Sequence, residues 1–239
     1  MGNLATRGRS IGAVALLGLA AAACRAAPTP TLPSPPLPTP GEPQAVATLA
    51  QMRGPWSPVP FVVPPEIVAA ADRACRPSIT VTPEENIVLV DVRGARTLQV
   101  WFAGPSFTSS CADVIVRADG TLMPTGGGHG GGGDYCGGFG PGQVIDRELD
   151  LRLMDRQTND LSGTVGITED DVLIRSTVAG CAGTSLASVW IQGSTIQPVG
   201  ATVSNGWFAA WMPGMWPEDG QVVGLGPGGE VLAQVPLFR

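Results

Sequence analysis

The chain has 239 residues, enough for one domain of moderate size or two small ones. Its 20 acidic residues outnumber 14 basic ones, all of them arginines, and the net charge is −6. An acidic chain without a basic cluster argues against nucleic acid as a partner.

The N-terminal residues have the pattern of an export signal. A cationic start precedes an uncharged, mostly apolar run at residues 11–23, which ends in small residues before Cys24. The run is shorter than the roughly 20 residues that cross a bilayer, which predicts a signal peptide over residues 1–23. Ordinary secretion, with cleavage after Ala21-Ala22-Ala23 and no role for the cysteine, is the alternative.

Small residues before a cysteine resemble the lipobox of bacterial lipoproteins, although Ala21 stands where that family usually carries Leu. The resemblance implies that Cys24 is acylated, with palmitate-type chains, and becomes the N-terminus after cleavage. Two or more acyl chains, at about 0.8 kcal/mol per buried CH₂, anchor a protein stably. The expected location is therefore the cell membrane, lipid-anchored on its extracytoplasmic side.

Residues 24–43 are expected to form the lipidated cysteine and a Pro-rich tether. Proline fixes φ and lacks a donor, so this stretch cannot be a helix or a central strand. In polyproline II geometry the tether would hold the following domain about 50 Å from the bilayer. A ligand for a proline-binding domain is the alternative reading.

Residues 44–239 are expected to form an exported, mainly β domain, with possible halves at 60–125 and 160–239 joined by a Gly-rich loop. A helix is predicted at residues 64–75, where Pro65 suits the first turn and Pro77 stops the helix. Alternating apolar patterns and turn residues predict strands at 87–92, 97–102, 111–117, 172–179, 186–191, 196–203, 207–211, 221–225 and 231–235. Residues 144–154 suit a strand, which is preferred, or the surface of a helix. The expected fold is antiparallel and sandwich-like, with one short N-terminal helix and disulfide staples.

The chain has five cysteines, so four remain for disulfides if Cys24 carries lipid. In an oxidising compartment, four cysteines predict two disulfides, here among Cys75, Cys111, Cys136 and Cys181. Four cysteines allow three pairings. We expect Cys75 with Cys111, which would join the helix to the first strands, and Cys136 with Cys181, which would tie the Gly-rich loop to the second half.

Residues 126–142 are rich in glycine and are expected to form a mobile loop held at Cys136. They contain His129, the one histidine of the chain. His129 with Asp134 and a serine would suggest hydrolysis, but no Gly-x-Ser-x-Gly elbow is present. The sequence thus predicts no catalytic residue.

No metal site or cofactor is expected either. The run Glu169-Asp170-Asp171 lacks the alternating ligand spacing of a calcium loop, and a solvated turn is the preferred interpretation. Trp207, Trp211 and Trp216 suggest a platform for sugars, with core packing as the preferred alternative. Trp216, which follows Pro213-Gly214, is expected on an exposed loop and is the candidate ligand contact.

The run from Ala201 to Gly214, ATVSNGWFAAWMPG, follows the strand SVWI at residues 188–191. These two runs resemble a phrase, V-x-L and then A-T-V-x-N-G-W-F-A-A-W-W-P-G, of uncharacterised envelope proteins of high-GC bacteria. DVRG at residues 91–94 and the strand that opens at Cys111 are similar to the N-terminal part of the same proteins. Met212 departs from the second tryptophan of that phrase. The resemblance implies an architecture but no activity.

Two classes of function follow from these patterns. The first is a non-enzymatic, lipid-anchored domain that binds or scaffolds another envelope protein or a glycan. The second is an exported hydrolase or carbohydrate-active enzyme, which would need two carboxylates about 5–9 Å apart.

Overall fold

The structure is a computed structural model that describes residues 44–78, 85–103, 108–125, 128–130, 136, 151–160, 162 and 174–238. They lie in one compact unit, Pro33–Arg239. The predicted signal peptide, Cys24, the Pro-rich tether, Asp134 and residues 169–171 fall outside the described residues.

Two short helices lie near the start of the described chain. Helix α2 (Pro65–Cys75) confirms the predicted helix and begins one residue later than predicted, because Pro64 is its N-cap residue. Helix α1 (Leu49–Arg53) was not predicted, so the expectation of a single helix was wrong. A capping box explains why so short a helix forms: the Thr48 hydroxyl accepts from the Gln51 amide at 3.2 Å, and Gln51 accepts from the Thr48 amide at 2.9 Å.

The remaining elements are strands, as expected for a mainly β fold. The described strands are β1 (Asn86–Val92), β2 (Thr97–Ala103), β3 (Thr108–Val116), β4 (Leu122–Pro124), β5 (Gly128–Gly130), β6 (Leu151–Asp160), β7 (Ile174–Ala182), β8 (Ser188–Gly193), β9 (Ile196–Gly200), β10 (Thr202–Ser204), β11 (Trp207–Pro213), β12 (Gln221–Leu225) and β13 (Val231–Pro236).

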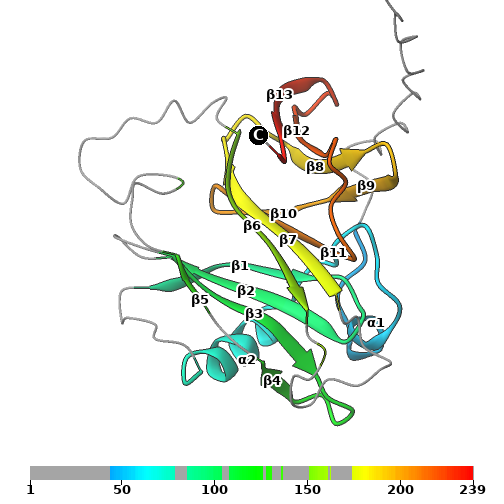
Figure 1. The fold of residues 1–239 in the computed structure, drawn as a ribbon. Helices are drawn as coiled ribbons and strands as arrows, with labels where there is room; N and C mark the ends of the chain where they lie inside the picture. The colour runs from blue at the N-terminus through cyan, green and yellow to red at the C-terminus, as the bar shows by residue number, and fades with distance from the viewer. Residues whose placement is uncertain are drawn as a thin grey trace, which may run out of the picture. The chain divides into compact units, whose positions relative to one another are not determined.

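These strands form three antiparallel sheets (Figure 1). The first sheet has the order β1-β2-β3-β4, with β5 also paired to β3. The second has the order β10-β11-β7-β6, and the third has the order β13-β12-β8-β9. The described sheets therefore confirm the predicted antiparallel fold class.

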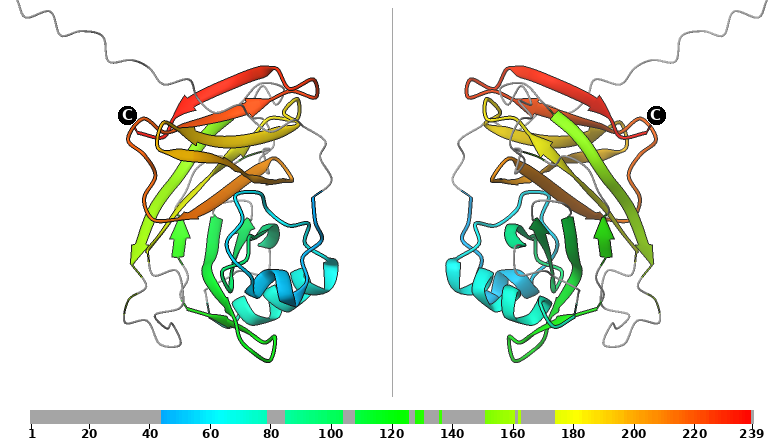
Figure 2. Two further views of the ribbon diagram at one scale, coloured as in Figure 1. Left: turned by 90° about the vertical axis from the view of Figure 1, so that its right-hand side faces the viewer. Right: turned by 90° about the vertical axis from the view of Figure 1, so that its left-hand side faces the viewer.

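The helices cover one face of the first sheet, the face away from the third sheet (Figures 1 and 2). Val90, Val100 and Phe102 of this sheet are buried in one cluster with Ala71 and Cys75 of α2. The apolar positions of α2 that recur at helical spacing therefore serve to dock it on the sheet.

The second and third sheets enclose another core, in the manner of a sandwich. Phe208 and Ala210 of β11 pack there with Ile191 of β8 and Val222 of β12. Successive residues of a strand point to opposite faces. Trp207 and Ala209 accordingly lie on the other face of β11. They pack against Val88 and Leu89 of β1, which joins the second sheet to the first.

One predicted strand is divided in two. Residues 196–203 were expected to be continuous, but β9 ends at Gly200 and β10 begins at Thr202 in a different sheet. At the division, a side chain on Gly200 would come within 3.1 Å of the Trp190 ring, and the amide of Ala201 bonds to the Val189 carbonyl at 2.8 Å. The close approach to Trp190 explains the glycine at this position.

Candidate functional site

The described surface contains a groove of about 360 Å³ where the first and second sheets meet. We call it the edge groove. It is lined by residues 60–63, by Val68 of α2, by residues 87–90 of β1 and by residues 202–205 of β10 and its turn, with Gln44 at one side. Its volume lies within the range of 300–1,000 Å³ that is typical of ligand sites.

Two sheet edges form the walls of this groove. β1 is the outer strand of the first sheet and β10 is the outer strand of the second. A side-chain amide holds them together at one end, because Asn205 donates from Nδ2 to the Val88 carbonyl at 3.3 Å. At the other end the hydroxyl of Thr202 donates to Oδ1 of Asp91 at 2.6 Å.

Asn205 can reach β1 because of the turn that it occupies. Asn205 and Gly206 have φ values of 52° and 79°, and they link the paired residues Ser204 and Trp207. Two central residues with positive φ define the type I′ hairpin turn, in which Asn-Gly is the preferred sequence. The Asn-Gly pair that the sequence marks as a turn therefore also forms one end of the groove.

The lining of the edge groove is uncharged. Of its described residues none carries a titratable side chain, and most are aliphatic. Val62 and Val203 are 45% and 38% exposed at the groove, and Val46, which forms a bridge with Val62, is 54% exposed. Exposed valines gathered at one place mark an interaction surface better than isolated ones do.

A buried ion pair lies next to the groove. Asp91 and Arg93 are completely buried, and Nε of Arg93 donates to Oδ2 of Asp91 at 2.7 Å. The two terminal nitrogens of the guanidinium donate to the carbonyls of Pro58, at 2.9 Å, and Gly200. The planar fork of arginine suits three partners in different directions, and here they belong to β1, β9 and the segment before α2.

The ion pair fixes how the first sheet meets the other two. Residues 91–94 are similar to the N-terminal part of the envelope proteins named above, but the pairing of Asp91 with Arg93 was not predicted. Residues i and i+2 of an extended strand point to the same face of the sheet. This spacing is the sequence signal that would have placed the two charges side by side. Burial of both charges requires the hydrogen bonds that Thr202 and the carbonyls supply.

The prediction that Trp216 is exposed was wrong. It is 5% exposed and lies in the core between the second and third sheets, so it is not available as a ligand contact. Trp207 and Trp211 are buried too, at 3% and 0% exposure, and Trp56 packs edge-on against Trp211 with ring centres 6.3 Å apart. Core packing of these tryptophans, the preferred interpretation, is confirmed.

His129 lies in β5, whose backbone pairs with β3, so the expected mobile loop is wrong for residues 128–130. The Cα of His129 is paired with that of Ser109. Among the described residues, no group of three or more His, Cys, Asp or Glu side chains is arranged to hold a metal ion.

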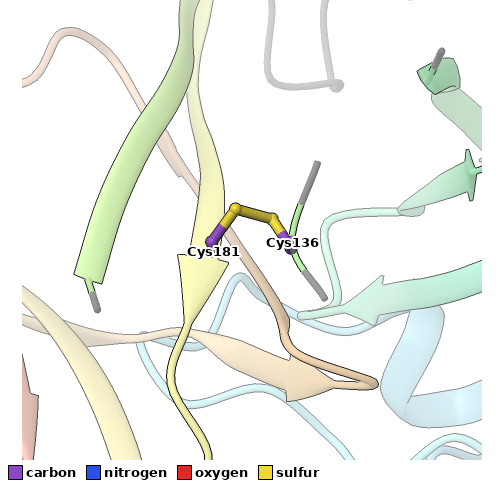
Figure 3. Close-up of a disulfide and its surroundings, with 2 residues drawn as sticks. All are labelled: Cys136 and Cys181. Carbon is purple, nitrogen blue, oxygen red and sulfur yellow. A yellow bond between two sulfur atoms is a disulfide. The ribbon is translucent and has the colours of Figure 1, made fainter. Parts of the chain in front are cut away.

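The predicted disulfide between Cys136 and Cys181 is confirmed (Figure 3). The two Cα atoms are 4.9 Å apart, and both residues are buried with Trp207 and Val88. Cys75 is also disulfide-bonded. The side chain of Cys111 is outside what the structure describes, so the pairing of Cys75 with Cys111 stays a prediction.

Among the described residues, three carboxyl groups have a pKa below the usual value, and each caps a turn away from the groove. The amide of Thr121, with its hydroxyl, lowers the pKa of Asp119. Ser162 and Ser194, each through its hydroxyl and its backbone amide, lower the pKa of Asp160 and of Asp219 respectively. These groups stabilise turns, and they offer the groove no acid or base.

No helix within the described part of the chain combines the length and the apolar character needed to cross a bilayer. Comparison with known proteins gives no match among family models, curated proteins or solved structures.

Proposed function

We propose that this chain is a lipid-anchored protein of the cell envelope whose β domain binds another envelope component in the edge groove, without catalysing a reaction. The observation that carries the proposal is the groove itself, with its two sheet edges and exposed valines at Val62 and Val203. An uncharged lining supports binding rather than acid–base chemistry, because proton transfer needs a titratable group within reach.

The anchor is supported by the sequence before the domain. A short apolar run ends in small residues and Cys24, and a Pro-rich segment follows. Metabolic labelling with a fatty-acid analogue tests it, in the wild type and in Cys24→Ser. We expect label in the wild type alone, and equal labelling of both proteins would contradict lipidation.

The binding role is tested by placing a charge in the groove. Val203→Arg introduces a cation at an apolar wall, whereas Val231→Arg introduces the same cation on β13 of the third sheet, at a valine that is 56% exposed. After mild cross-linking of intact envelopes, we expect the partner to stay with the wild type and Val231→Arg and to be lost from Val203→Arg. Equal recovery with all three proteins would contradict binding at the groove.

A further inference from the structure

We propose that the edge groove receives an extended, uncharged peptide, which adds to the first sheet as a strand alongside β1 at Val90. This inference rests on the proposed binding function and names the class of ligand. It follows from where the backbone of β1 is already paired and where it is open.

The backbone of β1 is paired at Val92 by a neighbouring segment. The amide of Phe61 donates to the Val92 carbonyl at 2.8 Å, so the polar backbone groups of Val92 point away from β2. Directions alternate along a strand, so Val90, two residues earlier, presents its amide and carbonyl to the same outer side. Val90 also lines the edge groove.

The outer backbone groups of Val90, a residue that is 6% exposed, have no hydrogen-bond partner among the described residues. None of the hydrogen bonds between described residues outside the β1–β2 ladder reaches its amide or carbonyl. Two residues before Val90, the carbonyl of Val88 accepts a hydrogen bond from Asn205. Val88 lies at a bulge, where it has no paired residue on β2. The open stretch therefore lies between two occupied positions.

The size of the opening fits a short extended peptide. Val92 lies four positions after Val88, which at a rise of about 3.3 Å per position corresponds to about 13 Å. Three or four residues of an added strand would fill this length. An open strand edge is a template for such an addition, with main-chain hydrogen bonds supplying affinity and side-chain pockets supplying specificity.

The walls determine which side chains are accepted. Val203, Val68 and Phe61 line the groove, so the side chains of an added strand would meet mostly apolar groups. No described lining residue is charged, so a charged side chain would lose water without gaining a partner. Uncharged, β-branched or small polar residues are the ones that fit.

The chain's own Pro-rich segment is the competing occupant, because it precedes Gln44 at the side of the groove. Proline lacks the N–H group that would donate a hydrogen bond to the Val90 carbonyl, and residues 26–43 contain eight prolines. A peptide from a partner protein fits the open edge better, and the experiment below separates the two occupants.

The test uses the blocked peptide acetyl-Val-Thr-Val-Thr-Val-amide as the probe. Its first control carries N-methyl groups at alternate residues, and its second carries Glu in place of both Thr. NMR measures amide exchange at Val90 in the whole chain, with Val203→Arg as the groove variant and Val231→Arg as its matched control. We expect at least tenfold slower exchange with the first peptide in the wild type and Val231→Arg, and no change with either control peptide or in Val203→Arg.

Three results would overturn the inference. If the N-methylated peptide protects Val90 equally, main-chain pairing is not the mode of binding, although the groove can still serve the proposed function. If no peptide slows exchange at Val90, the ligand is not an added strand. If protection appears only after deletion of residues 26–43, the Pro-rich segment is the occupant.

Discussion

The hydroxyl of Thr202 donates a 2.6 Å hydrogen bond to Oδ1 of Asp91, across the boundary between the second sheet and the first. The other carboxylate oxygen accepts from Arg93 at 2.7 Å. Both oxygens of this completely buried carboxylate therefore have donors, as burial of a charge requires. The same contact fixes one end of the edge groove, so stability and site geometry depend on it together.

Thr202→Val is expected to destabilise the protein by about 2 kcal/mol. It keeps the shape of the side chain but leaves one oxygen of Asp91 buried without a donor, and an orphaned buried acceptor costs about 1–3 kcal/mol. Urea unfolding followed by tryptophan fluorescence measures the change. Thr202→Ser, which keeps the hydroxyl, is the control, and an equal loss in both variants would mean that the hydrogen bond is not responsible.

Arg93→Met is expected to cost about 3–5 kcal/mol, because it leaves Asp91 as a buried charge without its ion-pair partner. The double variant Asp91→Leu/Arg93→Met should lose less than the sum of the two single variants, since it removes both charges at once. The free energies of unfolding of all three variants give the coupling. Additive losses would contradict the pairing of these two residues.

Arg93 and Asp91 also show what the sequence could and could not predict. Local signals were sufficient for α2, between its prolines, and for β12, whose bounds the alternating pattern gives. How the sheets meet depends on contacts between residues far apart in the chain, such as the hydrogen bond that Arg93 donates to the carbonyl of Gly200, 107 positions later. The edge groove lies where the first and second sheets meet, which is why its lining was not predicted.

Burial of aromatic residues was predictable only where a strand pattern was present. Trp207 and Trp211 lie in β11, and the alternation of that strand places them in the interior. Trp216 follows the strand, so no periodicity indicated its direction, and its burial depends on packing between two sheets. The short helix α1 was missed, although Thr48 and Gln51 carry the Thr-x-x-Gln signature of a capping box.

Removal of the Cys136–Cys181 disulfide, in Cys136→Ala/Cys181→Ala, should destabilise the protein by about 4 kcal/mol. The bridge closes a loop of 45 residues, and the estimate follows from the chain entropy that this closure removes from the unfolded state. Thermal unfolding under oxidising conditions measures it.

Non-reducing peptide mapping of the exported wild type decides the second bridge. We expect peptides that link Cys75 to Cys111, since Cys111 pairs through its backbone with Val100, which packs in the same core as Cys75. A peptide that joins Cys75 to any other cysteine would contradict this pairing.

Asp219→Asn should change how stability depends on pH at acidic values. The hydroxyl and amide of Ser194 lower the pKa of Asp219, so its carboxylate favours the folded state above the ordinary pKa of 3.8, and this contribution is lost as the pH falls through the folded-state pKa. Urea unfolding between about pH 3 and pH 6 should show the difference between wild type and variant shrinking below about pH 4. A difference that stays constant would contradict a lowered pKa.

The most direct measurement of the groove as a binding site is photo-cross-linking in living cells. A photoreactive amino acid is placed at position 203, in the groove wall, or at position 231, on an exposed strand of the third sheet. The account predicts a discrete adduct from position 203 alone, which disappears when Val62→Arg is added at another lining position of the groove. Adducts of the same size and yield from both positions, or an adduct at 203 that survives Val62→Arg, would contradict it.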